Sequence, residues 1–183
     1  LRRSSDIYIV PVMDIDNVAI GAGGKAQRPQ DHNRDWSDEP HWNAVRAAMA
    51  RIRKMDDQKR FRLFIDLHNP GAGSKQPFFY IAPRKLLNEE AASNLDRFLA
   101  AVQLEMTGPL AFKGQTQESG PGYDRNWKKI SKNWVTFNTR EGVVAVTLET
   151  AWNTPHSTTR GYRTVGRQLG MGVERYLRTE AAE

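Results

Sequence analysis

The sequence contains no cysteine, and only four of its 183 residues are histidine. Without cysteine the chain forms no disulfide and offers no thiolate to a metal ion. No apolar run approaches the roughly 18 residues that a membrane-spanning helix needs. A metal site would therefore depend on histidine and carboxylates. We expect a soluble protein, and whether it is cytoplasmic or exported stays unknown.

Hydrophobic residues make up 39% of the chain and include five tryptophans, which is typical of a globular protein rather than a disordered one. The length favours one domain over residues 1–183. The chain begins at Leu1 without an initiator methionine or the apolar core of a signal peptide. We therefore expect a domain that lacks its N-terminal part.

The net charge is +6. A basic patch could bind nucleic acid through phosphate contacts, whereas scattered positive charge improves solubility or lines a pocket for an anionic substrate. The basic residues are dispersed along the chain, and no nucleic-acid-binding module accompanies them. We expect no nucleic-acid partner and no membrane partner, and the oligomeric state stays unknown.

Apolar runs and helical periodicity predict alternating strands and helices. The predicted strands are 7–12, 61–68, 78–81, 134–138 and 143–149, and the predicted helices are 41–55, 88–106 and 159–177. Two long polar segments, 13–39 and 107–133, separate them. This order is typical of an α/β fold with a mixed, mostly parallel sheet flanked by helices.

Two of the predicted strands end in an ionisable residue. His68 ends the run from Phe61, and Glu149 ends the run from Val143. Open α/β sheets place their sites at the carboxyl ends of strands. Because side chains alternate along a strand, Asp66 lies on the same face as His68 and can support it. The alternatives to a functional site are that His68 is a structural, hydrogen-bonded histidine and that Glu149 pairs with an arginine.

A basic loop follows the first predicted strand and carries Lys25, Arg28, Asn33 and Arg34. A guanidinium beside an amide is well suited to hold a carboxylate, because its nitrogens form a charged fork. The alternative is a solvated basic loop. The same sheet edge would bring this loop to the two strand ends, which favours a site over either alternative.

Five segments together resemble the zinc carboxypeptidase family (peptidase M14-like), in the same order and at similar spacing. They are Pro11-Val-Met-Asp-Ile-Asp-Asn-Val18, Asp31-His-Asn-Arg-Asp-Trp36, Ile65-Asp-Leu-His68, Thr147-Leu-Glu149 and Glu149-Thr-Ala-Trp-Asn153 with the closing helix. The resemblance implies a three-layer α/β/α domain of the carboxypeptidase type, of which this chain would be the C-terminal portion. It also implies zinc as the cofactor.

The resemblance assigns the central chemistry to two residues. His68 resembles the third zinc ligand of the family. Glu149 resembles the catalytic glutamate, which takes a proton from water and passes it to the leaving amine. The implied activity is that of a metallocarboxypeptidase, which releases a C-terminal amino acid from a peptide.

The resemblance also implies substrate-binding roles. Asn33 and Arg34 would hold the terminal carboxylate of the substrate. Arg28 would stabilise the oxyanion, with Lys25 as the alternative, and Tyr123 resembles the mobile tyrosine of the family.

The sequence departs from the family in its metal ligands. The family takes its first two ligands from a His-x-x-Glu pair, and this chain contains no such pair. The other histidines, His32, His41 and His156, lie in different contexts. One ligand does not hold a catalytic zinc, which takes about three protein ligands. Three hypotheses stay open: part of a carboxypeptidase, part of an N-acyl amino acid deacylase, or a metal-free module that binds carboxylates.

Overall fold

The computed structural model describes residues 5–179. The helices are α1 (Ile15–Ala19), α2 (Asn43–Asp57), α3 (Glu89–Glu105), α4 (Ser131–Asn138) and α5 (Thr159–Thr179). The strands are β1 (Leu63–His68), β2 (Phe78–Ile81), β3 (Thr116–Glu118) and β4 (Val144–Glu149). The short 3-10 helices are η1 (Gly24–Ala26), η2 (His32–Arg34), η3 (Arg84–Leu86) and η4 (Trp127–Lys129). No described helix has both the length and the apolar character needed to span a bilayer.

The strands form one mixed sheet in the order β1-β4-β2-β3. β1 runs parallel to β4, β2 runs antiparallel to β4, and β3 runs parallel to β2. The register pairs His68 of β1 directly with Glu149 of β4. The two strand ends that the sequence singled out are therefore neighbours.

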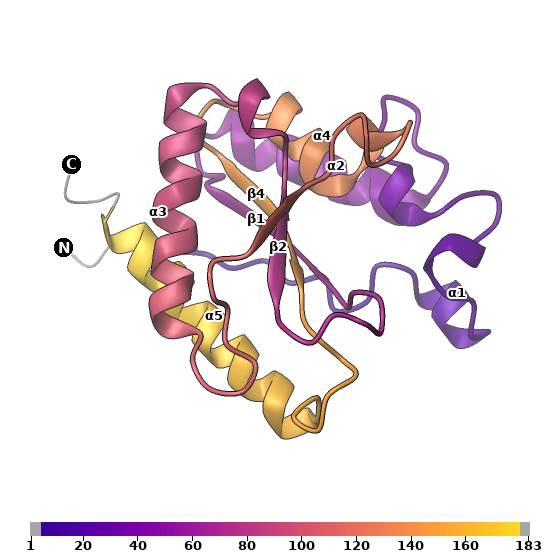
Figure 1. Cartoon of the computed structure of the whole chain (residues 1–183). Helices are drawn as coiled ribbons and strands as arrows, with labels where there is room; N and C mark the ends of the chain where they lie inside the picture. The colour runs from indigo at the N-terminus through magenta and orange to yellow at the C-terminus, as the bar shows by residue number, and fades with distance from the viewer. Residues whose placement is uncertain (1–4, 180–183) are drawn as a thin grey trace.

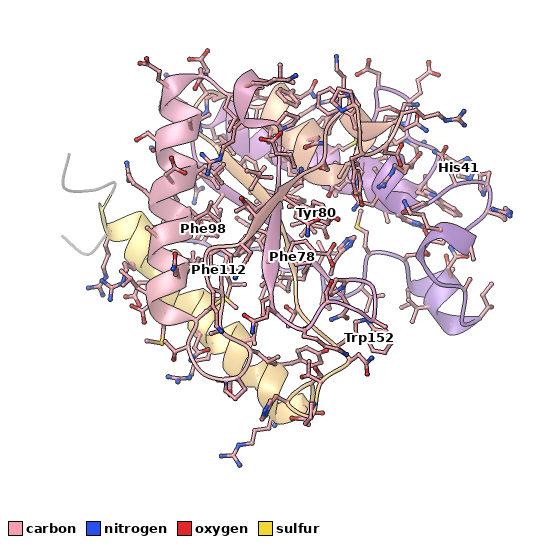
Figure 2. The ribbon with its side chains drawn as sticks, in the orientation of Figure 1. His41, Phe78, Tyr80, Phe98, Phe112 and Trp152 are labelled. Carbon is pink, nitrogen blue, oxygen red and sulfur yellow. The ribbon has the colours of Figure 1, made fainter. Side chains whose placement is uncertain are left out.

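The sheet lies between two layers of helices (Figure 1), which confirms the predicted α/β fold. α3 and α5 cover one face, where Phe79, Phe98 and Phe112 are buried together with Tyr176. α2 and α4 cover the other face, where Trp36, Trp134 and the apolar face of α2 are buried. Figure 2 labels Phe98, a residue of α3, and Phe112 near the same helix. Apolar burial on both faces accounts for the nearly continuous apolar sequence of β4.

Alternation along the strands decides which side chains reach the site. Leu63 and Ile65 pack against the α3–α5 core, whereas Phe64 packs against the α2–α4 core. Asp66 and His68 share the face of Phe64 because strand side chains repeat every two residues. The face predicted for Asp66 and His68 is therefore the one that the structure shows.

Residues 7–12 were predicted as a strand, and that prediction is wrong. The segment has no strand partner among the described residues, and its apolar side chains are exposed, with Ile9 at 77%. Tyr8 instead lies 4.3 Å from the guanidinium carbon of Arg51. Residues with high β propensity form a strand only where they pair and pack, and Pro11 also lacks a backbone donor.

Residues 134–138 were predicted as a strand and lie in helix α4. The backbone N–H of Trp134 donates to the carbonyl of Ile130, and the N–H of Thr139 donates to the carbonyl of Val135. Trp134 and Val135 are buried in the α2–α4 core. Packing on the helical face therefore overrides the local β propensity of these residues.

Helix α5 contains four glycines, which weaken it intrinsically and are tolerated where close packing requires them. The structure gives a reason for Gly172. A Cβ at Gly172 would lie 2.9 Å from the Cα of Val102, whereas a Cβ at Gly170 would meet no atom within 4 Å. Gly172 thus permits the close approach of α5 to α3.

We predict opposite effects for alanine at these two glycines. Gly172→Ala should lower the free energy of unfolding by about 1–3 kcal/mol, since the added methyl group overpacks the helix contact. Gly170→Ala, the matched control, should raise it by about 0.5–1 kcal/mol through helix propensity. Urea unfolding followed by circular dichroism measures both. If Gly172→Ala proved as stable as Gly170→Ala, the close contact between α3 and α5 would be refuted.

Candidate functional site

A cavity of about 170 Å³ lies at the carboxyl ends of β1 and β4. The loop around η1 and η2 contributes Lys25, Asn33 and Arg34 to its wall, and the strands contribute His68 and Glu149. The rest of the polar wall comes from Asp31, Tyr80, Ser119, Tyr123, Lys132 and Thr147. The site residues predicted from sequence thus converge, except for Arg28.

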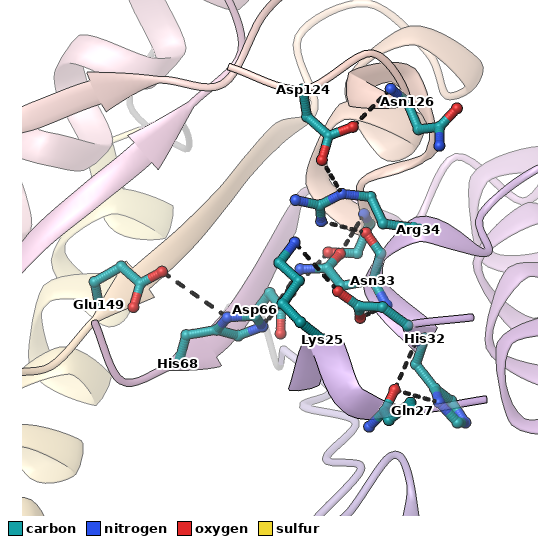
Figure 3. Close-up of polar contacts among 12 residues, drawn as sticks. Lys25, Gln27, His32, Asn33, Arg34, Asp66, His68, Asp124, Asn126 and Glu149 are labelled. Atoms are coloured by element: carbon teal, nitrogen blue, oxygen red, sulfur yellow. Dashed lines mark hydrogen bonds and ion pairs between the residues drawn. The ribbon is translucent and has the colours of Figure 1, made fainter. Parts of the chain in front are cut away.

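The His68 ring lies between two carboxylates (Figure 3). Its Nε2 is 3.2 Å from Oδ2 of Asp66, and its Nδ1 is 3.9 Å from Oε1 of Glu149. Ser131 donates from Oγ to the same Asp66 oxygen at 2.7 Å. Asp66 therefore holds the ring in place and leaves Nδ1 toward Glu149.

The charges of this group are coupled. Burial alone would lower the pKa of His68, but the hydrogen bond and charge of Asp66, together with the charge of Glu149, raise it above the ordinary value. Burial alone would raise the pKa of Asp66, but the hydrogen bond and charge of His68, with help from Ser131, lower it. The two groups thus stabilise each other's charged forms.

Glu149 is buried, and its Oε2 has no hydrogen-bond partner among the described atoms. Burial raises the pKa of Glu149, although the positive charge of His68 opposes the shift. A buried carboxylate with one free oxygen and a raised pKa is suited to accept a proton from a bound water.

Asn33 ties three segments together. Its Nδ2 donates to Oδ2 of Asp66 at 3.3 Å, and its Oδ1 accepts from the backbone N–H of Ser131 at 2.8 Å. Both ends of the amide are therefore engaged within the protein. The structure places Asn33 in the cavity wall as the group that orients η2, β1 and the start of α4.

Two nitrogens of the Arg34 guanidinium are engaged within the protein and one is not. Its Nε donates to Oδ2 of Asp124 at 2.8 Å, and its Nη1 donates to the carbonyl of Asn33 at 2.7 Å. Within residues 5–179, Nη2 has no hydrogen-bond partner. The hydrogen bond and charge of Arg34 lower the pKa of Asp124, which keeps that carboxylate ionised and the guanidinium held.

The two residues considered for the oxyanion role separate in the structure. Lys25 lines the cavity, 3.5 Å from Oδ2 of Asp31, with its side chain 72% exposed. Arg28 is exposed and is not part of the cavity wall. The geometry thus brings the alternative, Lys25, to the site.

Tyr123 lies in the wall with a second tyrosine that the sequence analysis missed. The rings of Tyr80 and Tyr123 are 5.2 Å apart, and the Tyr123 ring is 5.9 Å from the Arg34 guanidinium carbon. Burial, followed by the contact with Tyr123, raises the pKa of Tyr80 to about 12. Tyr80 comes from β2, where only its place in an apolar run was visible in the sequence.

The described residues do not form a catalytic zinc site. One imidazole nitrogen and one carboxylate face each other here, whereas catalytic zinc takes about three protein ligands. Residues 5–179 contain no group of three or more histidine, aspartate or glutamate side chains able to hold a metal ion. The zinc that the family resemblance implies would need further ligands from elsewhere.

Solved metallo-carboxypeptidases share this fold. The chain matches a metallo-carboxypeptidase from Burkholderia cenocepacia with a TM-score of 0.61 and 16% identity, over 81% of this chain and 39% of that chain. It matches a metallo-carboxypeptidase from Pseudomonas aeruginosa, in complex with (2-guanidinoethylmercapto)succinic acid, with a TM-score of 0.53 and 21% identity, over 81% and 38%.

These likenesses define a carboxypeptidase-like α/β fold. The chain spans about two fifths of the length of either structure. No protein family profile and no curated protein matches the sequence. The fold is therefore shown, while activity and substrate rest on the site itself.

We predict that the pKa of His68, measured by NMR titration, lies above the ordinary value of about 6.5. Asp66→Asn should lower it, because burial persists while the partner that stabilises the imidazolium is lost. Glu149→Gln, the comparison variant, should lower it less, since Glu149 acts by charge alone at 3.9 Å. An unchanged pKa in Asp66→Asn would show that the contact between the two side chains does not form in solution.

Proposed function

We propose that the cavity binds the free carboxylate of a peptide or an N-acyl amino acid and that the adjacent amide bond is hydrolysed there. One observation carries this proposal. Arg34, whose Nη2 has no partner within residues 5–179, and Glu149, whose buried Oε2 has none either, line the same cavity. The first is a donor for an anion, and the second is an acceptor for a proton.

Arg34 binds the carboxylate in this proposal. Its guanidinium is largely buried and is held by Asp124 and the Asn33 carbonyl, so little side-chain freedom is lost when a ligand binds. Asn33 serves as a positioning residue rather than a direct ligand of the carboxylate. Tyr123, beside Arg34, adds a hydroxyl to the same part of the wall.

Glu149 acts on water in this proposal. Its carboxylate takes a proton from a water molecule as the water oxygen attacks the amide carbonyl, and it later returns that proton to the leaving amine. Lys25, in place of Arg28, supplies positive charge for the oxyanion. Zinc, when bound through additional ligands, would polarise the carbonyl and acidify the water.

A solved structure with this fold supports the proposal. The Pseudomonas aeruginosa structure holds a compound named as a succinic acid, which carries carboxylates. A second hypothesis is a carboxylate-binding module without hydrolysis. The shortage of metal donors within residues 5–179 favours that hypothesis. Turnover assays separate the two.

Arg34→Gln tests the binding step. We expect at least tenfold weaker binding of N-acetylalanine by NMR titration, because a charged hydrogen bond contributes about 1.5–3 kcal/mol. Arg125→Gln is the matched control, since Arg125 is exposed and lies outside the cavity. Equal affinity of Arg34→Gln and the wild type would overturn the assignment of the carboxylate site.

Glu149→Gln tests the chemical step. We expect at least a hundredfold loss in the rate of hydrolysis of an acylated dipeptide in zinc-containing buffer, with affinity for N-acetylalanine kept within about threefold. Glu141→Gln, an exposed change, should leave both unaltered. Wild-type turnover by Glu149→Gln would disprove the role of Glu149. No turnover by the wild type would support the binding-module hypothesis.

A further inference from the structure

A lysine lies buried in the wall of this cavity. Lys132, at the start of α4, has no exposed surface. Its Nζ donates to Oγ of Ser119 and to Oδ1 of Asn133, both at 2.6 Å. Ser119 and Lys132 both line the cavity that holds Arg34 and Glu149. From the sequence, Lys132 was only one of the basic residues dispersed along the chain.

We propose that the Lys132–Ser119 pair makes the cavity select substrates whose terminal amino acid has an acidic side chain, such as glutamate or aspartate. This inference rests on the proposed function, since Arg34 holds the first carboxylate. Ser119 makes the contact with the second carboxylate, and Lys132 supplies the positive charge behind it.

The Ser119 hydroxyl has a donor that no described group of the protein uses. Its Oγ accepts from Lys132 Nζ at 2.6 Å and from Asn133 Nδ2 at 3.2 Å. A hydroxyl has two acceptor lone pairs and one donor. Lys132 occupies one lone pair; Asn133 Nδ2 already donates at 2.7 Å to the carbonyls of Ser119 and Trp127, so its longer contact with Oγ is weak. The hydroxyl hydrogen has no acceptor among residues 5–179. A ligand carboxylate is a suitable acceptor for this hydrogen bond, which the nearby ammonium group strengthens.

The electrostatic surroundings of Lys132 also favour an anionic ligand. Its direct partners are neutral oxygens, so no carboxylate touches the ammonium group. Burial lowers the pKa of Lys132 to about 7; the charges of Asp66 and Glu118 raise it in part, and the charge of Arg34 lowers it further. An anion in the cavity would stabilise the charged form of Lys132, and this stabilisation adds to the affinity for the anion.

The other side-chain classes fit this wall poorly. Beside Lys132, a basic side chain would place like charges together. An apolar side chain there would exclude water from the Ser119 hydroxyl without replacing the hydrogen bond. Ile130 is the one aliphatic hydrocarbon side chain in the lining. The volume of about 170 Å³ equals roughly six water molecules at about 30 Å³ each, which suits a short polar side chain.

The test compares N-acetylglutamate with N-acetylglutamine, which have nearly the same shape and differ in one negative charge. For the full chain at pH 6.5, we expect at least tenfold tighter binding of N-acetylglutamate by calorimetry. Lys132→Met should reduce this ratio to within twofold while Arg34 still holds the shared carboxylate. Lys129→Gln is the matched control, because Lys129 is exposed and outside the cavity, and it should keep the full ratio.

Ser119→Ala provides a second variant that keeps the lysine. It should also reduce the ratio, and circular dichroism confirms that each variant remains folded. Equal affinity of the wild type for the two ligands would overturn the selectivity while leaving the carboxylate site intact. A full ratio in a folded Ser119→Ala or Lys132→Met variant would overturn it as well. Failure of both ligands to bind would overturn the proposed function itself.

Discussion

The parallel register of β1 with β4 is the constraint on which the site depends. It pairs His68 with Glu149 at the same level of the sheet, so the imidazole and the carboxylate meet without any contribution from loops. A shift of one residue would turn Asp66, His68 or Glu149 toward the α3–α5 core, because strand side chains alternate. The buried apolar residues on both faces oppose such a shift.

The loop residues reach this pair through Asn33. Its amide joins Asp66 of β1 to the N–H of Ser131 in α4, and its own carbonyl accepts from Arg34. One side chain therefore sets the distance from the strand ends to the guanidinium. Substrate-binding loops are usually mobile, but this loop is anchored by hydrogen bonds to regular elements. Arg34 is thus placed relative to Glu149 before any ligand arrives.

The sequence predicted the parts of the site that follow from strand alternation and strand ends, namely Asp66, His68 and Glu149, and from a short motif, Asn33 and Arg34. It failed where burial depends on distant packing. Lys132 lies close to Lys128 and Lys129 and has the sequence context of an exposed charge, yet α4 turns it inward. The sequence placed residue 132 in the polar segment 107–133, before the strand predicted over 134–138, whereas α4 begins at Ser131 and includes it.

The electrostatics of the cavity explain how a buried glutamate and an anionic ligand can coexist. Arg34 is paired with Asp124, and Lys25 lies near Asp31 on the exposed side, where water and salt screen its charge. Lys132 is different, because it is buried and contacts only neutral oxygens. The positive charge of His68, 3.9 Å from Glu149, offsets the negative charge that Glu149 presents to an incoming carboxylate. A ligand with two carboxylates therefore gains from Arg34 and Lys132, whereas a ligand with one carboxylate leaves Lys132 without a counter-charge.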